Sequence, residues 1–279
     1  MNFQKILYGK PASEHLLSFI KLQAFNFEPC LAIVQVGNNS ASDLYIKFKM
    51  KKATEVEIST KLFKFDENIS YEDLKKHIEN LNYDQSIHGI IIQMPLPFHL
   101  SDITQLIDYR KDVDGLSVIQ QGRLCLGYSG LFPCTALGVI ELLKFYNIQL
   151  NSKKVAIIGR SSLVGKPLSL MFLHENSLVS ILHSKINFDL MKKELLNCDI
   201  ICSAVGKKHF IKSDCVKKGS VLIDIGVTKD QSETFGDIDP ECYIDSLAYT
   251  PNIGGVGPMT IACLLSNVVK SYQKNNLPK

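Results

Sequence analysis

The sequence predicts an α/β protein of two lobes, an N-terminal α/β domain followed by a Rossmann-type domain with a doubly wound parallel sheet. Short apolar runs alternate with helix-like stretches along the chain, which is the pattern of parallel α/β sheets. The charged turn Lys111–Gly115 interrupts this alternation, and Val155–Leu182 then forms a complete strand–helix–strand unit. A chain of 279 residues is long enough for two such domains.

Each expected element follows from its local pattern. Buried strands are expected at the apolar runs Leu31–Val36, Gly89–Ile92, Val155–Ile158, Val179–Leu182, Asp199–Ala204 and Val221–Ile225. Helices are expected at Leu44–Val56, Tyr71–Leu81 and Met259–Tyr272. Ser42 or Asp43 is expected to cap the first of these helices.

Composition and charge argue against several classes of protein. The net charge is +3 and the basic residues are scattered, whereas a nucleic-acid surface concentrates them. No apolar run approaches the roughly 20 residues that span a bilayer. Residues 1–5 lack the basic-then-apolar order of a signal peptide, so we expect a cytoplasmic protein. The eight cysteines form no C-x-x-C pair, which predicts reduced thiols and no metal site.

A glycine turn between a strand and a helix is the first candidate binding site. The strand Val155–Ile158 runs into Gly159, and Gly165 opens the following helix. Free N–H groups at such a helix N-terminus attract a pyrophosphate. Gly159 suits the tight turn, and Gly165 suits close packing of helix on strand. The spacing departs from G-x-G-x-x-G, so a strand–helix turn without a ligand is the alternative.

The side chains near this turn favour NADP over NAD. The strand Val179–Leu182 is followed by His183, Ser184 and Lys185, where NAD-specific sites carry an acidic residue for the ribose 2′-hydroxyl. With Arg160 in the glycine turn, they offer the donors and positive charge that a 2′-phosphate needs. The alternative is that these side chains are ordinary solvated surface.

Lys49 is the candidate acid–base group of the first domain. It follows Tyr45 by one helical turn at the border of an apolar stripe, so the two side chains share a surface. A lysine held against an apolar wall loses hydration, and its pKa falls. The alternative is a lysine whose head stays in water. The expected stripe consists of Leu44, Tyr45, Phe48, Ala53 and Val56.

Three further features could belong to the same site. Gln93 ends an apolar strand, and the carboxyl ends of strands face the ligand crevice of α/β sheets; the alternative is a strand cap. Asp114 in an Asp-Gly turn is either a turn former or an acceptor for the N–H groups of a heterocycle. The glycine-rich loop 254–257 before the last helix permits close approach to a ligand, or is a flexible linker.

Together these segments resemble the bifunctional methylenetetrahydrofolate dehydrogenase/cyclohydrolase (FolD-type) family over nearly the whole chain. The marks, in the family's order, are Ser42-x-x-Tyr45-x-x-x-Lys49, Gln93-Met94-Pro95-Leu96-Pro97, Lys111-Asp112-Val113-Asp114-Gly115, Pro133-Cys134-Thr135, Gly159-Arg160-Ser161-x-x-Val164-Gly165-x-Pro167 and Gly254-Gly255-Val256-Gly257-Pro258-Met259-Thr260. The sequence departs from the family pattern at Ala136, at Lys185-Ile186 and at Asn252-Ile253, and none of these positions touches the candidate catalytic residues.

The resemblance implies an NADP-dependent oxidation of 5,10-methylenetetrahydrofolate, followed by hydrolysis of the methenyl product to 10-formyltetrahydrofolate. A folate-binding catalytic domain would span residues 1–116, joined by the C-terminal helix within 256–279, and an NADP-binding Rossmann domain would span 117–255. The catalytic residues would be Lys49, Gln93, which orients it, and Tyr45, which stacks on the folate. Asp114, Gly255 and Pro258 would bind the substrate with Tyr45. The implied cofactor residues are Gly159, Arg160, Ser161, Val164, Gly165, Ser184, Ala204, Gly206 and Gly226. A homodimer is implied as well.

Two other classes of function remain open at this point. One is an NADP-dependent dehydrogenase of another small substrate, such as a shikimate-type or amino-acid dehydrogenase, which has no need of Tyr45 beside Lys49. The other is a binding module that senses NADP, which needs neither Lys49 nor Gln93. A dehydrogenase that lacks the cyclohydrolase step is a narrower alternative.

Overall fold

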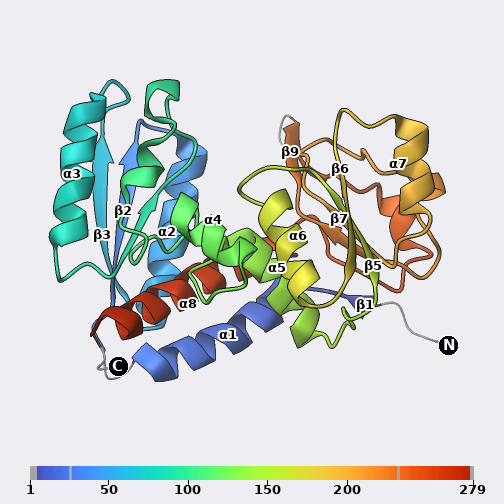
Figure 1. Ribbon diagram of the computed structural model, residues 1–279, viewed down its shortest axis with the longest axis horizontal. Coiled ribbons are helices and arrows are strands. Elements are labelled where there is room, and N and C mark those ends of the chain that lie inside the picture. The colour runs from blue at the N-terminus through green and yellow to red at the C-terminus, as the bar shows by residue number, and fades with distance from the viewer. Residues whose placement is uncertain (1–4, 25–26, 231–232, 277–279) are drawn as a thin grey trace. The chain divides into compact units, whose positions relative to one another are not determined.

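The computed structural model describes residues 5–24, 27–230 and 233–276 (Figure 1). Four of the five residues used in the signal-peptide argument, residues 1–4, lie outside this part. The chain divides into two compact units: residues 14–134 with 261–279, called here the first unit, and residues 1–13 with 135–260, the second unit. Among the helices described, none is long and apolar enough to cross a membrane. The domain bounds at 116 and 255 stay predictions.

The first unit is built on a three-stranded parallel sheet in the order β3-β2-β4. Its strands are β2 (Cys30–Val36), β3 (Ser59–Phe65) and β4 (Gly89–Ile92). Its helices are α2 (Ser40–Glu55), α3 (Tyr71–Tyr83) and α4 (Val118–Cys125), with 3₁₀ turns η1 (Phe98–Leu100) and η2 (Ile103–Leu106). The helices α1 (Gly9–Ala24) and α8 (Gly257–Asn276) each have residues in both units.

The core of the first unit explains why β2 is apolar along its length except at Gln35. Every residue of β2 is buried, because β3 and β4 pair with it on both sides. The helix α3 contributes Leu74, Ile78 and Leu81, spaced at helical intervals, to the same cluster. The carboxyl ends of β2 and β4 are thereby fixed side by side.

The second unit contains a six-stranded parallel sheet in the order β1-β11-β8-β7-β5-β6. Its strands are β1 (Lys5–Ile6), β5 (Lys154–Ile158), β6 (Leu178–Leu182), β7 (Ile200–Ser203), β8 (Val221–Asp224) and β11 (Ala248–Tyr249). A separate antiparallel hairpin joins β9 (Val227–Asp230) to β10 (Glu233–Gly236). The helices are α5 (Cys134–Phe145), α6 (Gly165–His174) and α7 (Phe188–Leu195), with η3 (Ser213–Cys215) and η4 (Pro240–Tyr243).

The doubly wound topology of this sheet is confirmed. The chain passes from β5 to β6 on one side and then to β7 and β8 on the other, so the strand order reverses between β5 and β7. In open α/β sheets, ligands bind outside the carboxyl ends of the strands at such a reversal. The segments that follow β5, β6 and β7 therefore define the place to look for a cofactor.

The structure corrects two expectations about α2. The N-cap is Asn39, whose Oδ1 accepts the N–H of Ser42 at 3.1 Å, so neither Ser42 nor Asp43 caps the helix. The expected apolar stripe does not pack as one face. Ala53 and Val56 are buried together with Ile46, whereas the aromatic side of the helix is open to solvent. The exposed fractions on that side are 53% for Leu44, 54% for Tyr45 and 51% for Phe48.

The strands expected from apolar runs are all present within two residues of their predicted ends. The strand β3 was not expected, because its polar positions alternate with half-buried ones and the segment contains two lysines. Its pattern is typical of an edge strand, which is where it lies in the sheet.

Candidate active site

Lys49 and Gln93 meet at the carboxyl end of the three-stranded sheet. Lys49 projects from α2, and Gln93 follows the last residue of β4, where its backbone N–H donates to Val34 O at 2.8 Å. The Lys49 Nζ donates a hydrogen bond to Gln93 Oε1 at 2.9 Å, and Gln93 Nε2 donates to Met94 O at 2.8 Å. The amide of Gln93 is thus fixed with its oxygen toward the lysine.

The charge state of Lys49 is set by its surroundings. Burial lowers the pKa of its ammonium, and the nearby Asp114 acts in the opposite direction. Burial raises the pKa of the Asp114 carboxyl, while the nearby Lys49 and then the Cys134 thiol oppose the shift. Both shifts bring the pair closer to its neutral forms. A lysine with a lowered pKa can exchange protons near neutral pH.

Cys134 is a member of this cluster that sequence reasoning gave no role. Its Sγ donates to Val113 O at 3.3 Å, and the side chain is buried. Burial, with Asp114 as the next cause, raises the pKa of the thiol well above its usual value, so the thiol stays protonated. The motif Pro133-Cys134-Thr135 was the available signal. The thiol fills the site beside Asp114 without adding a charge.

The turn that carries Asp114 is held by the neighbouring carboxylate. Asp112 Oδ1 accepts the N–H of Gly115 at 3.0 Å, and its Oδ2 accepts the N–H of Ser117 at 2.7 Å. Gly115 has φ +72°, a conformation that favours glycine. The backbone of the turn is joined to the sheet because Ile90 N donates to Lys111 O at 2.8 Å. Asp112 is therefore a structural carboxylate, and Asp114 is free to face a ligand.

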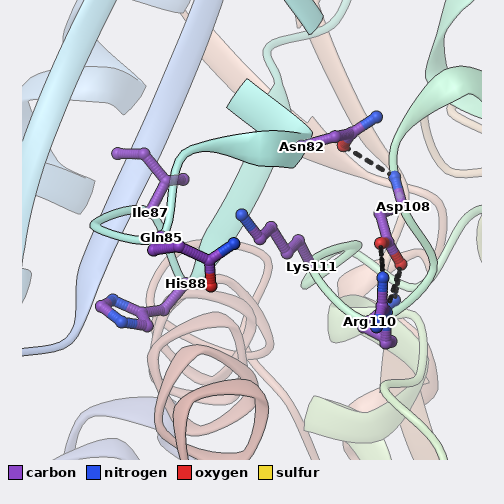
Figure 2. Close-up of a pocket in the computed structure, with 7 residues that line it drawn as sticks. All are labelled: Asn82, Gln85, Ile87, His88, Asp108, Arg110 and Lys111. Atoms are coloured by element: carbon purple, nitrogen blue, oxygen red, sulfur yellow. Dashed lines mark hydrogen bonds and ion pairs between the residues drawn. The ribbon is translucent and has the colours of Figure 1, made fainter. Parts of the chain in front are cut away.

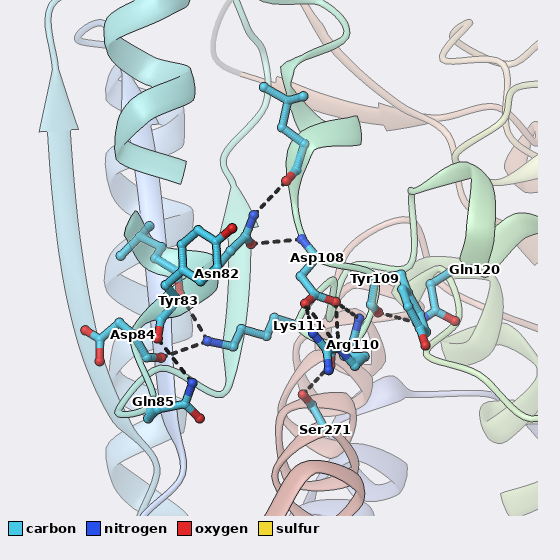
Figure 3. A network of polar contacts seen from close by, with 12 residues as sticks. Asn82, Tyr83, Asp84, Gln85, Asp108, Tyr109, Arg110, Lys111, Gln120 and Ser271 are labelled. Carbon is cyan, nitrogen blue, oxygen red and sulfur yellow. Dashed lines mark hydrogen bonds and ion pairs between the residues drawn. The ribbon is translucent and has the colours of Figure 1, made fainter. Parts of the chain in front are cut away.

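A polar network supports the chain just before this turn (Figures 2 and 3). Lys111 is only 8% exposed, and its Nζ donates to Leu81 O at 3.1 Å and Asp84 O at 2.7 Å at the end of α3. Arg110 Nε contacts both carboxylate oxygens of Asp108 at 3.0 and 3.1 Å. These side chains border a small cavity of about 120 Å³ (Figure 2).

The amide of Asn82 adds the remaining link in this network. Its Nδ2 donates to Leu106 O, and its Oδ1 accepts the N–H of Asp108, both at 2.8 Å (Figure 3). Because Lys111 and Asn82 bond to backbone groups of the fold itself, we interpret the network as support for the Asp114 turn.

The remaining predicted folate-site residues divide between the units. Tyr45 lies in the first unit with Lys49, Gln93 and Asp114, and its exposed ring is available for stacking. Gly255 and Pro258 lie in the second unit, in and just after the loop that leads into α8. That loop is anchored by Asn252, which departs from the family pattern: its Nδ2 donates to Thr234 O at 3.0 Å. The roles of Gly255 and Pro258 toward the substrate stay predictions.

The glycine turn of the second unit has the predicted geometry. Gly159 has φ +117°, and a Cβ there would lie 2.8 Å from Ala204 O. A Cβ on Gly165 would lie 2.2 Å from Gly159 O, so only glycine permits this packing of helix on strand. Ser161 Oγ accepts the N–H of Val164 at 3.1 Å and that of Gly165 at 3.4 Å. The turn and the first residues of α6 therefore form one rigid cradle.

A cavity of about 480 Å³ opens at the reversal of the strand order. It is lined by Ile158, Gly159, Arg160, His183, Ser184, Ile186, Phe188, Met191, Val205, Lys207 and Phe210. The predicted residues Gly159, Arg160 and Ser184 come together in it, and Ala204 and Gly206 flank Val205 in the loop after β7. Gly226 lies after β8 and is not among the lining residues.

The charge of this cavity suits a phosphate. Arg160, His183, Ser184 and Lys207 line it, and no acidic side chain appears among its described lining residues. Lys207 was not among the predicted cofactor residues, and the structure places it in the wall of the cavity with Arg160. Phe188 and Phe210 supply apolar surface beside these donors, so the cavity combines the two features that an adenosine phosphate requires.

Comparisons with known proteins match both units. A family model described as the catalytic domain of tetrahydrofolate dehydrogenase/cyclohydrolase matches residues 7–114, and the model of the NAD(P)-binding domain of the same family matches residues 133–276. The bifunctional protein FolD of Campylobacter concisus is 40% identical, over 96% of this chain and 98% of its own length.

Solved structures agree with these sequence matches. The crystal structure of the bifunctional FolD methylenetetrahydrofolate dehydrogenase/cyclohydrolase of Campylobacter jejuni is 39% identical, with a TM-score of 0.94 over 98% of this chain and 99% of that one. The methylenetetrahydrofolate dehydrogenase-cyclohydrolase of Trypanosoma brucei, complexed with NADP and an inhibitor, is 25% identical, with a TM-score of 0.91 over 100% of both chains.

Proposed function

The chain belongs to the tetrahydrofolate dehydrogenase/cyclohydrolase family, and on that premise we propose that Lys49, held by Gln93 beside Asp114, is the acid–base group of its chemistry. The enzyme oxidises 5,10-methylenetetrahydrofolate with NADP to the 5,10-methenyl form and hydrolyses that product to 10-formyltetrahydrofolate. The observation that carries the assignment of Lys49 is its 2.9 Å hydrogen bond to Gln93 together with its lowered pKa. A shikimate-type dehydrogenase and an NADP sensor are thereby set aside.

The oxidation requires positioning more than acid–base catalysis. Bound in the second unit, NADP would supply the hydride acceptor for the bridging methylene carbon of the folate, whose adjacent nitrogen lone pairs would stabilise the resulting cation. We assign the cofactor to the second unit. Arg160, Ser184 and the cradle formed by Gly159 and Gly165 would hold its phosphates. No proton needs to be moved by Lys49 in this step.

The hydrolysis requires a proton to be moved twice. Water adds to the methenyl carbon, and neutral Lys49 accepts the proton that the water loses. As the carbon–N5 bond then breaks, the proton held by Lys49 passes to N5 and the proton of the new hydroxyl group is released to solvent, which leaves the formyl group on N10. The lowered pKa of Lys49 supplies the neutral amine for the first transfer. Gln93 Oε1 accepts a hydrogen bond from Lys49 Nζ. This contact orients the amine so that its lone pair and its other N–H group face the substrate.

The folate is bound by groups around this lysine. We assign the stacking surface to Tyr45, whose ring is exposed on the open side of α2. Asp114 would accept hydrogen bonds from the amino and ring N–H groups of the pterin. Gly255 and Pro258 are assigned to the substrate from the family pattern.

A homodimer in the cytoplasm completes the proposal. The strand β6 lies at the edge of the six-stranded sheet and exposes Leu178 and Ile181, and an uncovered apolar edge strand favours pairing with another chain. All eight cysteines are free, which fits a reducing compartment. Light scattering coupled to gel filtration would give the mass of the assembly, and a monomer at micromolar concentration would refute the dimer.

The function is tested by one coupled reaction. Purified protein is mixed with methylenetetrahydrofolate and either NADP or NAD, nicotinamide reduction is followed, and the folate products are analysed from the same mixture. We expect rapid reduction with NADP and formation of 10-formyltetrahydrofolate faster than buffer alone hydrolyses the methenyl form. Absence of reduction with both cofactors, in folded protein, would contradict the proposed activity.

A further inference from the structure

Asp237 is a fully buried carboxylate that binds the loop following β7. It comes directly after β10 and has no exposed surface. Its Oδ2 accepts the N–H of Val205 at 2.8 Å and the hydroxyl of Ser203 at 2.9 Å. Its Oδ1 accepts the N–H of Lys207 at 2.7 Å. One side chain thereby fixes two backbone N–H groups in a four-residue loop.

This loop forms one wall of the cofactor cavity. Val205 and Lys207 line the cavity together with Arg160 and Ser184. The loop also packs on the glycine turn, because a Cβ on Gly159 would approach Ala204 O to 2.8 Å. Gly206 has φ +63°, so the loop bends sharply between its two anchored N–H groups. Because this loop is a wall of the cavity, the hydrogen bonds from the loop to Asp237 also set the position of that wall.

The carboxylate is itself held so that it cannot move away. The N–H of Asp237 donates to Asp224 Oδ1 at 2.9 Å, which fixes the backbone of Asp237. A Cβ on Gly226 would lie 2.1 to 2.2 Å from the Asp237 carboxylate, so the glycine leaves room for this one side chain. Burying a carboxylate is costly unless several donors compensate it, and hydrogen bonds to a charged acceptor are the strong ones. The arrangement has the features of a rigid support.

We propose that Asp237 is a positioning residue for NADP, which preorganises the Ala204–Lys207 loop for the cofactor without touching the folate site. This inference rests on the assignment of NADP to the cavity at the reversal of the strand order. In Asp237→Asn, one of the two N–H groups of the loop faces an amide NH₂ instead of an oxygen, because an asparagine offers a single acceptor oxygen. The loop then loses at least one anchor, and part of the binding energy is spent on ordering it.

The experiment measures NADP affinity and both activities in three variants of the full chain. In Asp237→Asn we expect the Kd and KM for NADP to rise about tenfold or more, with kcat at saturating NADP within about twofold of the parent. Hydrolysis of methenyltetrahydrofolate, which uses no NADP, should stay within about twofold. Ser203→Ala is the matched control, since it removes a buried hydrogen bond to the same carboxylate and leaves both loop N–H groups bound. Its NADP affinity should change by less than about threefold.

The variant Arg160→Ala distinguishes the positioning role of Asp237 from the assignment of NADP to this cavity. Loss of NADP affinity in Arg160→Ala but not in Asp237→Asn would overturn the positioning role alone. Unchanged affinity in Arg160→Ala would overturn the cavity assignment and the positioning role with it. Equal loss in Ser203→Ala and Asp237→Asn, or parallel loss of both activities in Asp237→Asn, would show a general structural effect and contradict the proposal.

A second measurement needs no variant. Hydrogen exchange of the parent protein without cofactor should show the N–H groups of Val205 and Lys207 protected, although they lie in a loop. Fast exchange at both positions without NADP would overturn the proposal, because the loop would then be ordered by the cofactor and not by Asp237.

Discussion

Lys49 donates a hydrogen bond of 2.9 Å from Nζ to Oε1 of Gln93, across 44 residues of sequence. The bond joins the helix after β2 to the end of β4, and so ties Lys49 to a strand that is buried in the core of the first unit. Burial lowers the pKa of Lys49, and a neutral acceptor such as Gln93 leaves that shift in place. A negatively charged acceptor at position 93 would instead raise the pKa of Lys49.

Replacing Gln93 by glutamate should therefore move the pH dependence of hydrolysis. Neutral Lys49 is the active form in water addition, so the rate rises with pH through the pKa of Lys49. A carboxylate at position 93 stabilises the ammonium, raises that pKa and shifts the rising limb to higher pH. The kcat/KM for methenyltetrahydrofolate, corrected for the buffer reaction, is measured against pH. Gln85→Glu, at the opposite end of the sheet, is the control. Superimposable profiles for Gln93→Glu and the parent would argue against Lys49 as the titrating group.

Removing the guanidinium of Arg160 should weaken the binding of NADP more than the binding of NAD. Arg160 lines the cavity with Ser184 and Lys207, where the extra phosphate of NADP is expected. In Arg160→Ala we expect the KM for NADP to rise about tenfold or more while the KM for NAD changes little. Lys185→Ala removes a charge beside Ser184 that does not line the cavity, and it should leave both constants nearly unchanged. An equal effect on the two cofactors would place the 2′-phosphate elsewhere.

Replacing Lys111 by methionine should destabilise the protein. The buried Nζ satisfies two carbonyl oxygens at the end of α3, and an apolar side chain would leave both without a donor. A loss of about 2 kcal/mol in the free energy of unfolding is expected, which urea titration measures. Lys61→Met removes an exposed lysine and should change stability by less than about 0.5 kcal/mol. If the two variants were equally stable, the polar network would not support the Asp114 turn.

The stability of the protein should fall as pH rises toward 7. Burial raises the pKa of Asp224 from 3.8 to about 7, so the folded protein keeps a proton that the unfolded chain has lost. Between these values the folded state binds more protons, and its stability decreases with increasing pH. Asp224→Asn has no proton to lose, so from about pH 4 to 7 the melting temperature of the parent should fall relative to that of the variant. Parallel curves would show that Asp224 does not titrate in this range.

The architecture of both units follows from local sequence patterns. Fully buried parallel strands are continuous apolar runs, so β2, β4, β5 and β8 are visible without a structure. The edge strand β3 has no such signal, because one side of it meets solvent and its lysines read as surface. The cap of α2 was misplaced because Asn39, Ser42 and Asp43 are all good caps, and only tertiary packing decides among them.

Candidate site residues could be predicted where their place on a helix or at the end of a strand indicates a role. They could not be predicted where the role depends on contacts between distant segments. Gln93 stands at the end of a strand and Lys49 on a helix, so both were found from position. The placement of Cys134 beside Asp114, and of Asp237 beneath the loop after β7, depends on contacts between segments 20 to 32 residues apart in sequence. No local pattern encodes such contacts. Lys207 was not predicted as a cofactor residue, because the sequence around an exposed lysine does not show whether a ligand faces it.

The most direct test compares the two activities of Lys49→Met with those of the parent. Methionine keeps the length of the side chain and removes its proton chemistry. We expect hydrolysis of methenyltetrahydrofolate to fall to the buffer rate, while NADP-dependent oxidation of methylenetetrahydrofolate retains a measurable fraction of its rate. Lys51→Met, on the same helix and exposed, should retain both. Equal loss of the two activities in folded Lys49→Met would contradict the account, because Lys49 would then position the folate and not move the proton.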